Sequence, residues 1–142
     1  MSRPLLYHRQ PTNKTCGQTV LAMIMGNDPE FVIENMGGNQ TAANKLRTVL
    51  GLFGYKTTNT RRFLKRWYTN TDHTGDAAVV YMKQGVNEHG RKWKHWVLYY
   101  KGKVYDPGLG YACSWETYVK KNMKNGARFT SYFQVEIEGL EP

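Results

Sequence analysis

The sequence has very few cysteines and no long apolar segment. Its two cysteines, Cys16 and Cys113, are too few to build a disulfide framework, and they favour a reducing setting. No apolar run approaches the roughly 20 residues that a membrane-spanning helix needs. Residues 1–9 lack the continuous apolar stretch of a signal peptide. We therefore expect a cytoplasmic protein without a membrane span.

Acidic residues are also scarce, because 11 Asp and Glu stand against 20 Lys and Arg and leave a formal net charge of +9. This excess favours anionic partners, although a solvated basic face explains it more simply. Basic and aromatic residues lie together at 65–68 and 91–94, as in proteins that stack on nucleic acid, but no nucleic-acid motif accompanies them. We expect a protein or peptide partner, which the charge would suit if it is acidic, and regard nucleic acid as less favoured.

The sequence does contain enough apolar material for a folded core. Hydrophobic residues make up 40% and aromatic residues 13% of the 142 residues, which excludes a disordered basic tail. No repeat, low-complexity tract or linker interrupts the chain, so we expect residues 1–142 to form a single domain. We expect no metal and no other cofactor, because paired zinc-ligand spacing is absent from His8, His73, His89 and Cys113.

The first half of the sequence predicts helices. Residues 16–26 are apolar on nearly all sides and end on a glycine, as a buried helix does. Residues 28–38 begin with the capping sequence Asp-Pro-Glu and end on two glycines. We expect a third helix to be capped by Thr41 and to end at Gly54, and residues 63–67 suggest one or two further turns.

The second half predicts an antiparallel sheet. The expected strands are residues 77–82, 95–100, 103–106 and 129–137. Lys101-Gly102 fits a two-residue hairpin turn between the second and third strands. Ser114 is expected to cap a helix that Asn125-Gly126 closes. The predicted fold class is α+β, with an N-terminal helical half packed on a C-terminal antiparallel sheet.

Cys16 is the first candidate for chemistry. A cysteine at the start of a helix gains thiolate character from the positive end of the helix dipole, and thiolate is the nucleophile. Gln10 lies six residues earlier, where a loop could bring its amide beside the thiol as an oxyanion donor. The simpler alternative is that Cys16 is a small buried apolar residue.

The hairpin register provides Cys16 with a base. If Lys101-Gly102 is the loop, Val97 faces Asp106, and His95 shares a face with Asp106 diagonally across the pair, roughly 7 to 8 Å apart between backbones. The carboxylate would then fix the imidazole while its other nitrogen faces the thiol. Taken singly, His95 also fits an edge-strand histidine and Asp106 a turn residue.

Together these residues resemble a known family. The segment 10–24, with its six-residue step from glutamine to cysteine, is similar to that of papain-like cysteine peptidases. It is most similar to the bacteriocin-processing, or double-glycine, peptidases and their stand-alone relatives. Their cysteine helix is followed by a helix like residues 41–55, and later by a His-Trp-Val strand and an Asp-Pro turn, as at 95–97 and 105–108. The resemblance covers about residues 8 to 123 and implies a papain-like cysteine proteinase fold.

The resemblance also implies a role for each residue of the site. It makes Cys16 the nucleophile, His95 the general base and then acid, Asp106 the orienting group, and Gln10 with the Cys16 backbone N–H the oxyanion hole. Many family members have Asp where this chain has Thr15, a change that leaves these residues intact. No transporter is attached to the chain, so leader-peptide processing during export is not supported.

Two classes of function follow from the sequence. The first is a cysteine hydrolase that cleaves a peptide or isopeptide bond through an acyl-enzyme on Cys16. The same residues would also serve a glutamine deamidase, an acyl transferase or a cell-wall amidase, because these reactions share the thioester. The second class is a non-enzymatic basic binding module for an acidic protein or nucleic acid. A depressed Cys16 pKa with His95 in hydrogen-bond reach would favour the enzyme.

Overall fold

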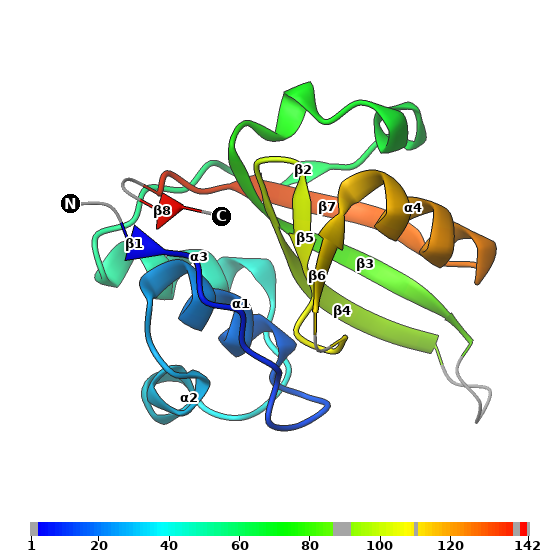
Figure 1. Ribbon diagram of the computed structural model, residues 1–142. Helices are drawn as coiled ribbons and strands as arrows, with labels where there is room; N and C mark the ends of the chain where they lie inside the picture. Colours follow the sequence, from blue (N-terminus) through cyan, green and yellow to red (C-terminus); the bar gives the residue numbers. More distant parts are fainter. Residues whose placement is uncertain (1–2, 87–91, 110, 138–139, 142) are drawn as a thin grey trace.

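The computed structural model describes the chain except for residues 1–2, 87–91, 110, 138–139 and 142 (Figure 1). The helices of the described residues are α1 (Cys16–Met25), α2 (Pro29–Met36), α3 (Ala43–Leu52) and α4 (Trp115–Lys124), with the short 3-10 turns η1 (Lys65–Thr69) and η2 (Asp72–Thr74). The main sheet has the strand order β2 (Arg61–Arg62), β7 (Arg128–Gln134), β3 (Ala77–Val86), β4 (Lys92–Tyr100), β5 (Lys103–Tyr105) and β6 (Ala112–Ser114). All its neighbouring strands run antiparallel.

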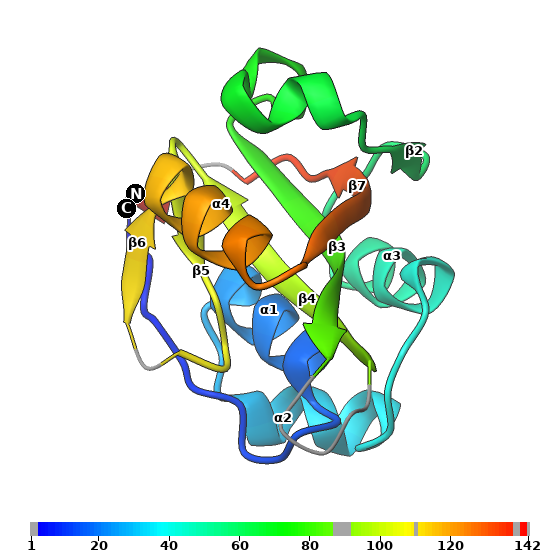
Figure 2. The same cartoon turned by 90° about the vertical axis from the view of Figure 1, so that its right-hand side faces the viewer.

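Both faces of this sheet are covered by helices. Helices α1, α2 and α3 gather against one face, and α4 lies on the other (Figures 1 and 2). Alternate residues of β3 divide accordingly, because Val79 joins the cluster around α1 while Val80 joins the cluster around α4. This arrangement is the expected α+β class, with helices packed on an antiparallel sheet.

The predicted helices are found close to their expected positions. Helix α1 ends at Gly26, whose φ of 68° is left-handed and whose N–H bonds the carbonyl of Ala22. Helix α2 begins with a proline and stops at Gly37, as its sequence predicts. Ser114 caps α4 by accepting a 3.2 Å hydrogen bond from the Thr117 N–H.

The prediction that Thr41 caps the third helix is wrong. Helix α3 begins at Ala43, with Ala42 in the N-cap position. The reason is a tertiary contact, since the Trp96 indole Nε1–H donates a 3.0 Å hydrogen bond to the Thr41 carbonyl. That bond holds Thr41 against the sheet and outside the helix.

The hairpin between β4 and β5 has the predicted register. Tyr100 pairs with Lys103 and Leu98 with Tyr105. Lys101 and Gly102 have φ values of 45° and 86°, as both central residues of a type I′ turn require. Strands β3 and β7 differ in length from expectation, because β3 continues to Val86 and β7 ends at Gln134.

Four very short strands were not predicted. They are β2, β6 and the parallel pair β1 (Arg3–Pro4) and β8 (Leu140–Glu141). Strands of two or three residues are too short to show the alternation by which a strand is recognised. In the described part of the chain, no helix has the length and apolar character needed to cross a membrane.

Candidate active site

The candidate active site lies where the sheet is open beside β4. Strand β5 pairs with β4 only between Leu98 and Tyr100. Beyond this point the first residue of α1 takes the place of a longer β5, and the Cys16 sulfur accepts a hydrogen bond from the backbone N–H of Trp96. The start of α1 is thus fixed to the strand that carries His95.

This approach is close enough to require a glycine after the cysteine. A Cβ at Gly17 would lie 2.7 Å from Thr41 Oγ1, 3.1 Å from Leu46 Cδ2 and 3.3 Å from Trp96 Cδ1. Because the first of these distances is far inside van der Waals contact, any other residue would collide with Thr41 and crowd Leu46 and Trp96. The glycine after Cys16 therefore allows α1 to pack closely on both β4 and the segment that leads into α3.

Three of the predicted residues meet at this point. His95 Nε2 lies 2.5 Å from Asp106 Oδ1. Since Nε2 is engaged by the carboxylate, the other ring nitrogen, Nδ1, is left for the hydrogen bond that His95 makes with Cys16. The exposed fractions of the three residues are 4% for Cys16, 5% for His95 and 2% for Asp106. Water is therefore largely excluded from the contact between the thiol and the imidazole.

The Asp106 carboxylate is held by two further donors. The backbone N–H of Gly108 donates to Oδ1 at 2.7 Å, and the Tyr118 hydroxyl donates to Oδ2 at 2.6 Å. The Tyr7 hydroxyl donates to the Asp106 backbone carbonyl. Burial by itself would raise the Asp106 pKa, but the hydrogen bond and charge of His95, with the bonds from the Tyr118 hydroxyl and the Gly108 N–H, hold it below its usual value. Asp106 is consequently a fixed, ionised partner for the imidazole.

The pKa values of the thiol and the imidazole are shifted in opposite directions. Burial acts to raise the Cys16 pKa, yet the hydrogen bond and charge of His95, with the backbone N–H groups of Trp96 and Gly17, lower it. Burial acts to lower the His95 pKa, but its bonds and charge interactions with Asp106 and Cys16 raise it. Both shifts favour a thiolate beside an imidazolium.

The second cysteine has a different environment. Cys113 lies on β6 and is half-buried. Burial and the negative charge of Asp106 raise its pKa, against a smaller opposing influence of Lys121. Only Cys16 therefore has the lowered pKa that activates a thiol.

Gln10 lies beside the site, in the loop that leads to α1. Its backbone N–H donates a 2.9 Å hydrogen bond to the carbonyl of Pro107, the residue after Asp106. Its side-chain nitrogen donates at 2.9 Å to the Thr12 carbonyl, and its buried Oε1 has no hydrogen-bond partner among the described residues. The structure thus brings Gln10 to the turn that carries Asp106, with its amide bonded to the loop.

Thr15 closes the same loop. Its hydroxyl donates to the Thr12 carbonyl at 3.1 Å and accepts the Thr12 N–H at 3.2 Å. Its carbonyl accepts both the N–H and the hydroxyl of Thr19, at 3.0 and 2.8 Å. Thr15 is therefore a structural residue that fixes the turn immediately before Cys16.

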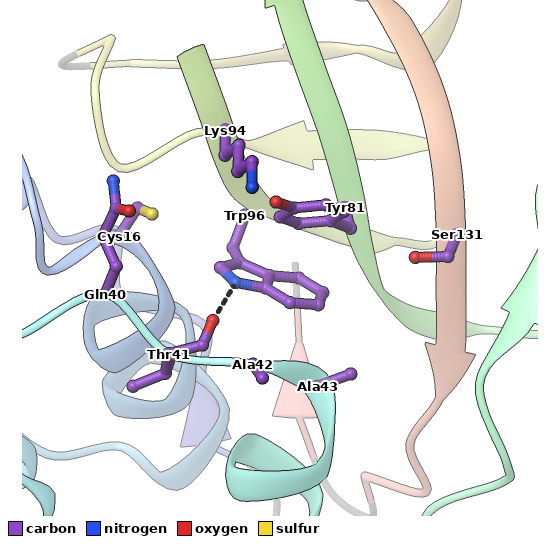
Figure 3. A pocket seen from close by; sticks show the side chains of 9 residues that line it. All are labelled: Cys16, Gln40, Thr41, Ala42, Ala43, Tyr81, Lys94, Trp96 and Ser131. Carbon is purple, nitrogen blue, oxygen red and sulfur yellow. Dashed lines mark hydrogen bonds between the residues drawn. The ribbon is translucent and has the colours of Figure 1, made fainter.

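A pocket of about 400 Å³ opens beside the Cys16 sulfur (Figure 3). One wall is the segment that leads into α3, including Thr41, Ala42 and Ala43. The rings of Tyr81 and Trp96 form the sheet side, with their centroids 4.5 Å apart. A substrate group next to the bond under attack would have space here.

The sequence indicated Cys16, His95 and Asp106, but it did not indicate Tyr118 as a site residue. In the sequence, Tyr118 is marked only by its place on the apolar face of the predicted helix. That face also packs on β4, so the same pattern fits a purely structural residue. Trp96, the residue after His95, lines the pocket beside the site.

The remaining titratable residues form no metal centre in the described part of the chain, where no three His, Cys, Asp or Glu side chains are grouped to hold an ion. His89, one of the histidines considered, lies outside the described residues. Comparison with models of known protein families and with curated proteins gives no match for this chain. The geometry of the site is therefore the basis on which its function is inferred.

Proposed function

We propose that the protein is a papain-like cysteine hydrolase that cleaves a peptide or isopeptide bond through an acyl-enzyme on Cys16. The observation that carries the proposal is the contact of Cys16, at the start of α1, with a histidine whose other nitrogen is 2.5 Å from a buried carboxylate. Thiol acyl transfer requires a nucleophile in contact with a base, and a further group, here a carboxylate, that orients the base. A buried cysteine of purely structural use would have no need of this arrangement.

Acylation begins with the thiolate. The Cys16 sulfur attacks the carbonyl carbon, a C–S bond forms, and the carbonyl electrons move to the oxygen. When the tetrahedral intermediate collapses, the C–N bond breaks and the proton on His95 Nδ1 passes to the leaving amine. The product is a thioester on Cys16 beside a neutral imidazole. Asp106 keeps the ring in position throughout, because its bond to Nε2 fixes the tautomer.

Deacylation reverses the role of the histidine. The neutral His95 accepts a proton from water as the water oxygen attacks the thioester carbonyl. The C–S bond then breaks, the product leaves as a carboxylic acid that gives its remaining proton to water, and the thiolate and imidazolium are restored. The oxyanion of both steps would be bound by the Cys16 backbone N–H and by the Gln10 amide nitrogen, which has a second hydrogen beyond the one donated to Thr12.

The other reactions of this thioester differ in the amide attacked or in the acceptor. A deamidase would attack a glutamine side chain, and a transferase would pass the acyl group to an amine instead of water. A binding module without activity would not need the opposite pKa shifts of Cys16 and His95, so these shifts support the enzyme.

The test is incubation of the protein with a broad pool of peptides in water labelled with heavy oxygen, followed by mass spectrometry. We expect new C-termini that carry the label, whereas a deamidase would place the label in glutamine side chains without chain cleavage. Cys16→Ala should abolish the products. The absence of any product that depends on Cys16 would contradict the proposal.

A further inference from the structure

We propose that the pocket beside Cys16 binds an acidic substrate side chain, so that the enzyme selects peptides with glutamate or aspartate at one position near the scissile bond. This inference rests on the proposed function and specifies its substrate class. It is carried by the charge and shape of the pocket in Figure 3.

The walls of the pocket suit the aliphatic stem of a side chain. The indole of Trp96 and the ring of Tyr81 face the methyl groups of Ala42 and Ala43 across it (Figure 3). An occupant with methylene groups would remove this apolar surface from water. A glycine pair has no side chain, so it would leave a space of about 400 Å³ unfilled. The pocket therefore does not match the double-glycine substrates of the peptidases that the sequence resembles.

Apart from the Cys16 thiolate, which pairs with the His95 imidazolium, the charge of the pocket is positive. Among the described lining residues Lys94 is the only other charged one, and its ammonium lies at the same end as the Tyr81 hydroxyl, with Ser131 at the opposite end (Figure 3). Lys83 lies directly opposite Lys94 in the pairing of β3 with β4, and both lysines are exposed. Within the described residues neither of them forms an ion pair with a carboxylate.

Hydrogen-bond donors complete the recognition of a carboxylate. Burial and the nearby Cys16 charge raise the pKa of Tyr81, so its hydroxyl keeps a proton to donate. A carboxylate that reaches the rim would meet the Lys94 ammonium and this hydroxyl together. Charge complementarity of this kind acts mainly on specificity, because a basic side chain at the same place would meet two lysines that form no ion pair among the described residues.

The first arm of the test is cleavage of a peptide library in which each position near the scissile bond is varied. We expect glutamate or aspartate to be preferred at one position by about two- to fivefold over glutamine or asparagine, as for a partly exposed ion pair. Lys94→Glu should transfer that preference to lysine or arginine. The matched control is Lys124→Glu, which makes the same charge change on α4 across the sheet and should leave the preference intact.

The second arm does not need hydrolysis. The rates at which Cys16 reacts with iodoacetate, an anion, and with neutral iodoacetamide are compared. Lys94→Glu should lower the ratio of the iodoacetate rate to the iodoacetamide rate by about two- to fivefold, whereas Lys124→Glu should leave this ratio unchanged.

The two arms keep the two proposals apart. A peptide pool that is never cleaved, with a ratio that still falls in Lys94→Glu, would contradict the hydrolase and retain the anion-selective pocket. Cleavage without a preference for glutamate or aspartate would overturn the inference about the pocket. An equal change of the iodoacetate-to-iodoacetamide ratio in Lys94→Glu and Lys124→Glu would overturn it as well.

Discussion

Trp96 on β4 and Pro107 after β5 are the next hydrogen-bonding pair in the hairpin register set by Leu98 and Tyr105, and the strand pairing stops before them. Pro107 has no N–H to donate to the Trp96 carbonyl, and its own carbonyl accepts the Gln10 N–H instead of the Trp96 N–H. The Trp96 N–H bonds the Cys16 sulfur. The ladder therefore stops at Pro107, at the edge where the nucleophile, the base and the orienting carboxylate meet.

The close packing of α1 on this edge predicts a contrast between two glycines. Gly17→Ala should destabilise the protein by about 1–3 kcal/mol, because the new Cβ would lie 2.7 Å from Thr41 Oγ1. The control is Gly51→Ala within α3, where a Cβ meets nothing within 4 Å. That change should stabilise by about 0.5–1 kcal/mol through helix propensity. Urea unfolding of the two variants measures both effects, and equal shifts would contradict the packing described here.

Removal of the buried carboxylate should be costly. Asp106→Ala leaves His95, Tyr118 and the Gly108 N–H without their acceptor, and we expect a loss of about 3–5 kcal/mol in the free energy of unfolding. Asp106→Asn keeps the shape and one acceptor oxygen and should lose less. Neutralising the exposed Glu116, which pairs with Lys120 on the surface of α4, should change the stability little. A similar small effect at Asp106 would show that its hydrogen bonds are not formed.

Tyr118 is expected to act as a positioning residue. Tyr118→Phe removes the 2.6 Å hydrogen bond to Asp106 Oδ2 while keeping the ring that packs in the core. We expect a loss of about 1.5–3 kcal/mol in stability, as for a hydrogen bond to a charged group. A purely structural role would leave the Cys16 pKa unchanged, whereas a positioning role predicts that the onset of Cys16 alkylation moves to higher pH.

The pH dependence of stability follows from the direction of the Asp106 shift. Its pKa in the folded protein is lowered, so the ionised carboxylate contributes stability above the unfolded-state pKa of about 3.9. This contribution is lost as the pH falls through the folded-state pKa. The stability difference between wild type and Asp106→Asn should therefore be largest near neutral pH and shrink in acid. Denaturant midpoints measured from pH 7 to pH 2 would reveal it, and a difference independent of pH would contradict the shift.

Local sequence signals account for most of the fold. The glycine after α1, the proline at the start of α2 and the Ser114 cap of α4 each depend on neighbouring residues alone, and each lies where it was predicted. The Lys101-Gly102 turn likewise fixed the register that brings His95 to Asp106. Thr41 failed as a cap because its carbonyl is engaged by Trp96, 55 positions away, and no local pattern contains that bond.

The candidate site could likewise be predicted only where it depends on local sequence signals. Cys16, His95 and Asp106 could be found because a helix start and a hairpin register are local features. The contribution of Tyr118 depends on how α4 crosses the sheet, and the pocket depends on how the segment before α3 lies against β4. Both require tertiary packing that neither propensity nor spacing specifies.

The central claim is that Cys16 and His95 form an activated thiolate and imidazolium, and its most direct test is thiol reactivity against pH. Alkylation by iodoacetamide is followed by mass spectrometry at Cys16 and, as the internal control, at Cys113, in wild type and in His95→Ala. We expect Cys16 to react well below the free-thiol pKa of about 8.5, Cys113 only at higher pH, and the histidine variant to lose the advantage at Cys16. Equal reactivity of the two cysteines, or an unchanged Cys16 profile in His95→Ala, would contradict the account.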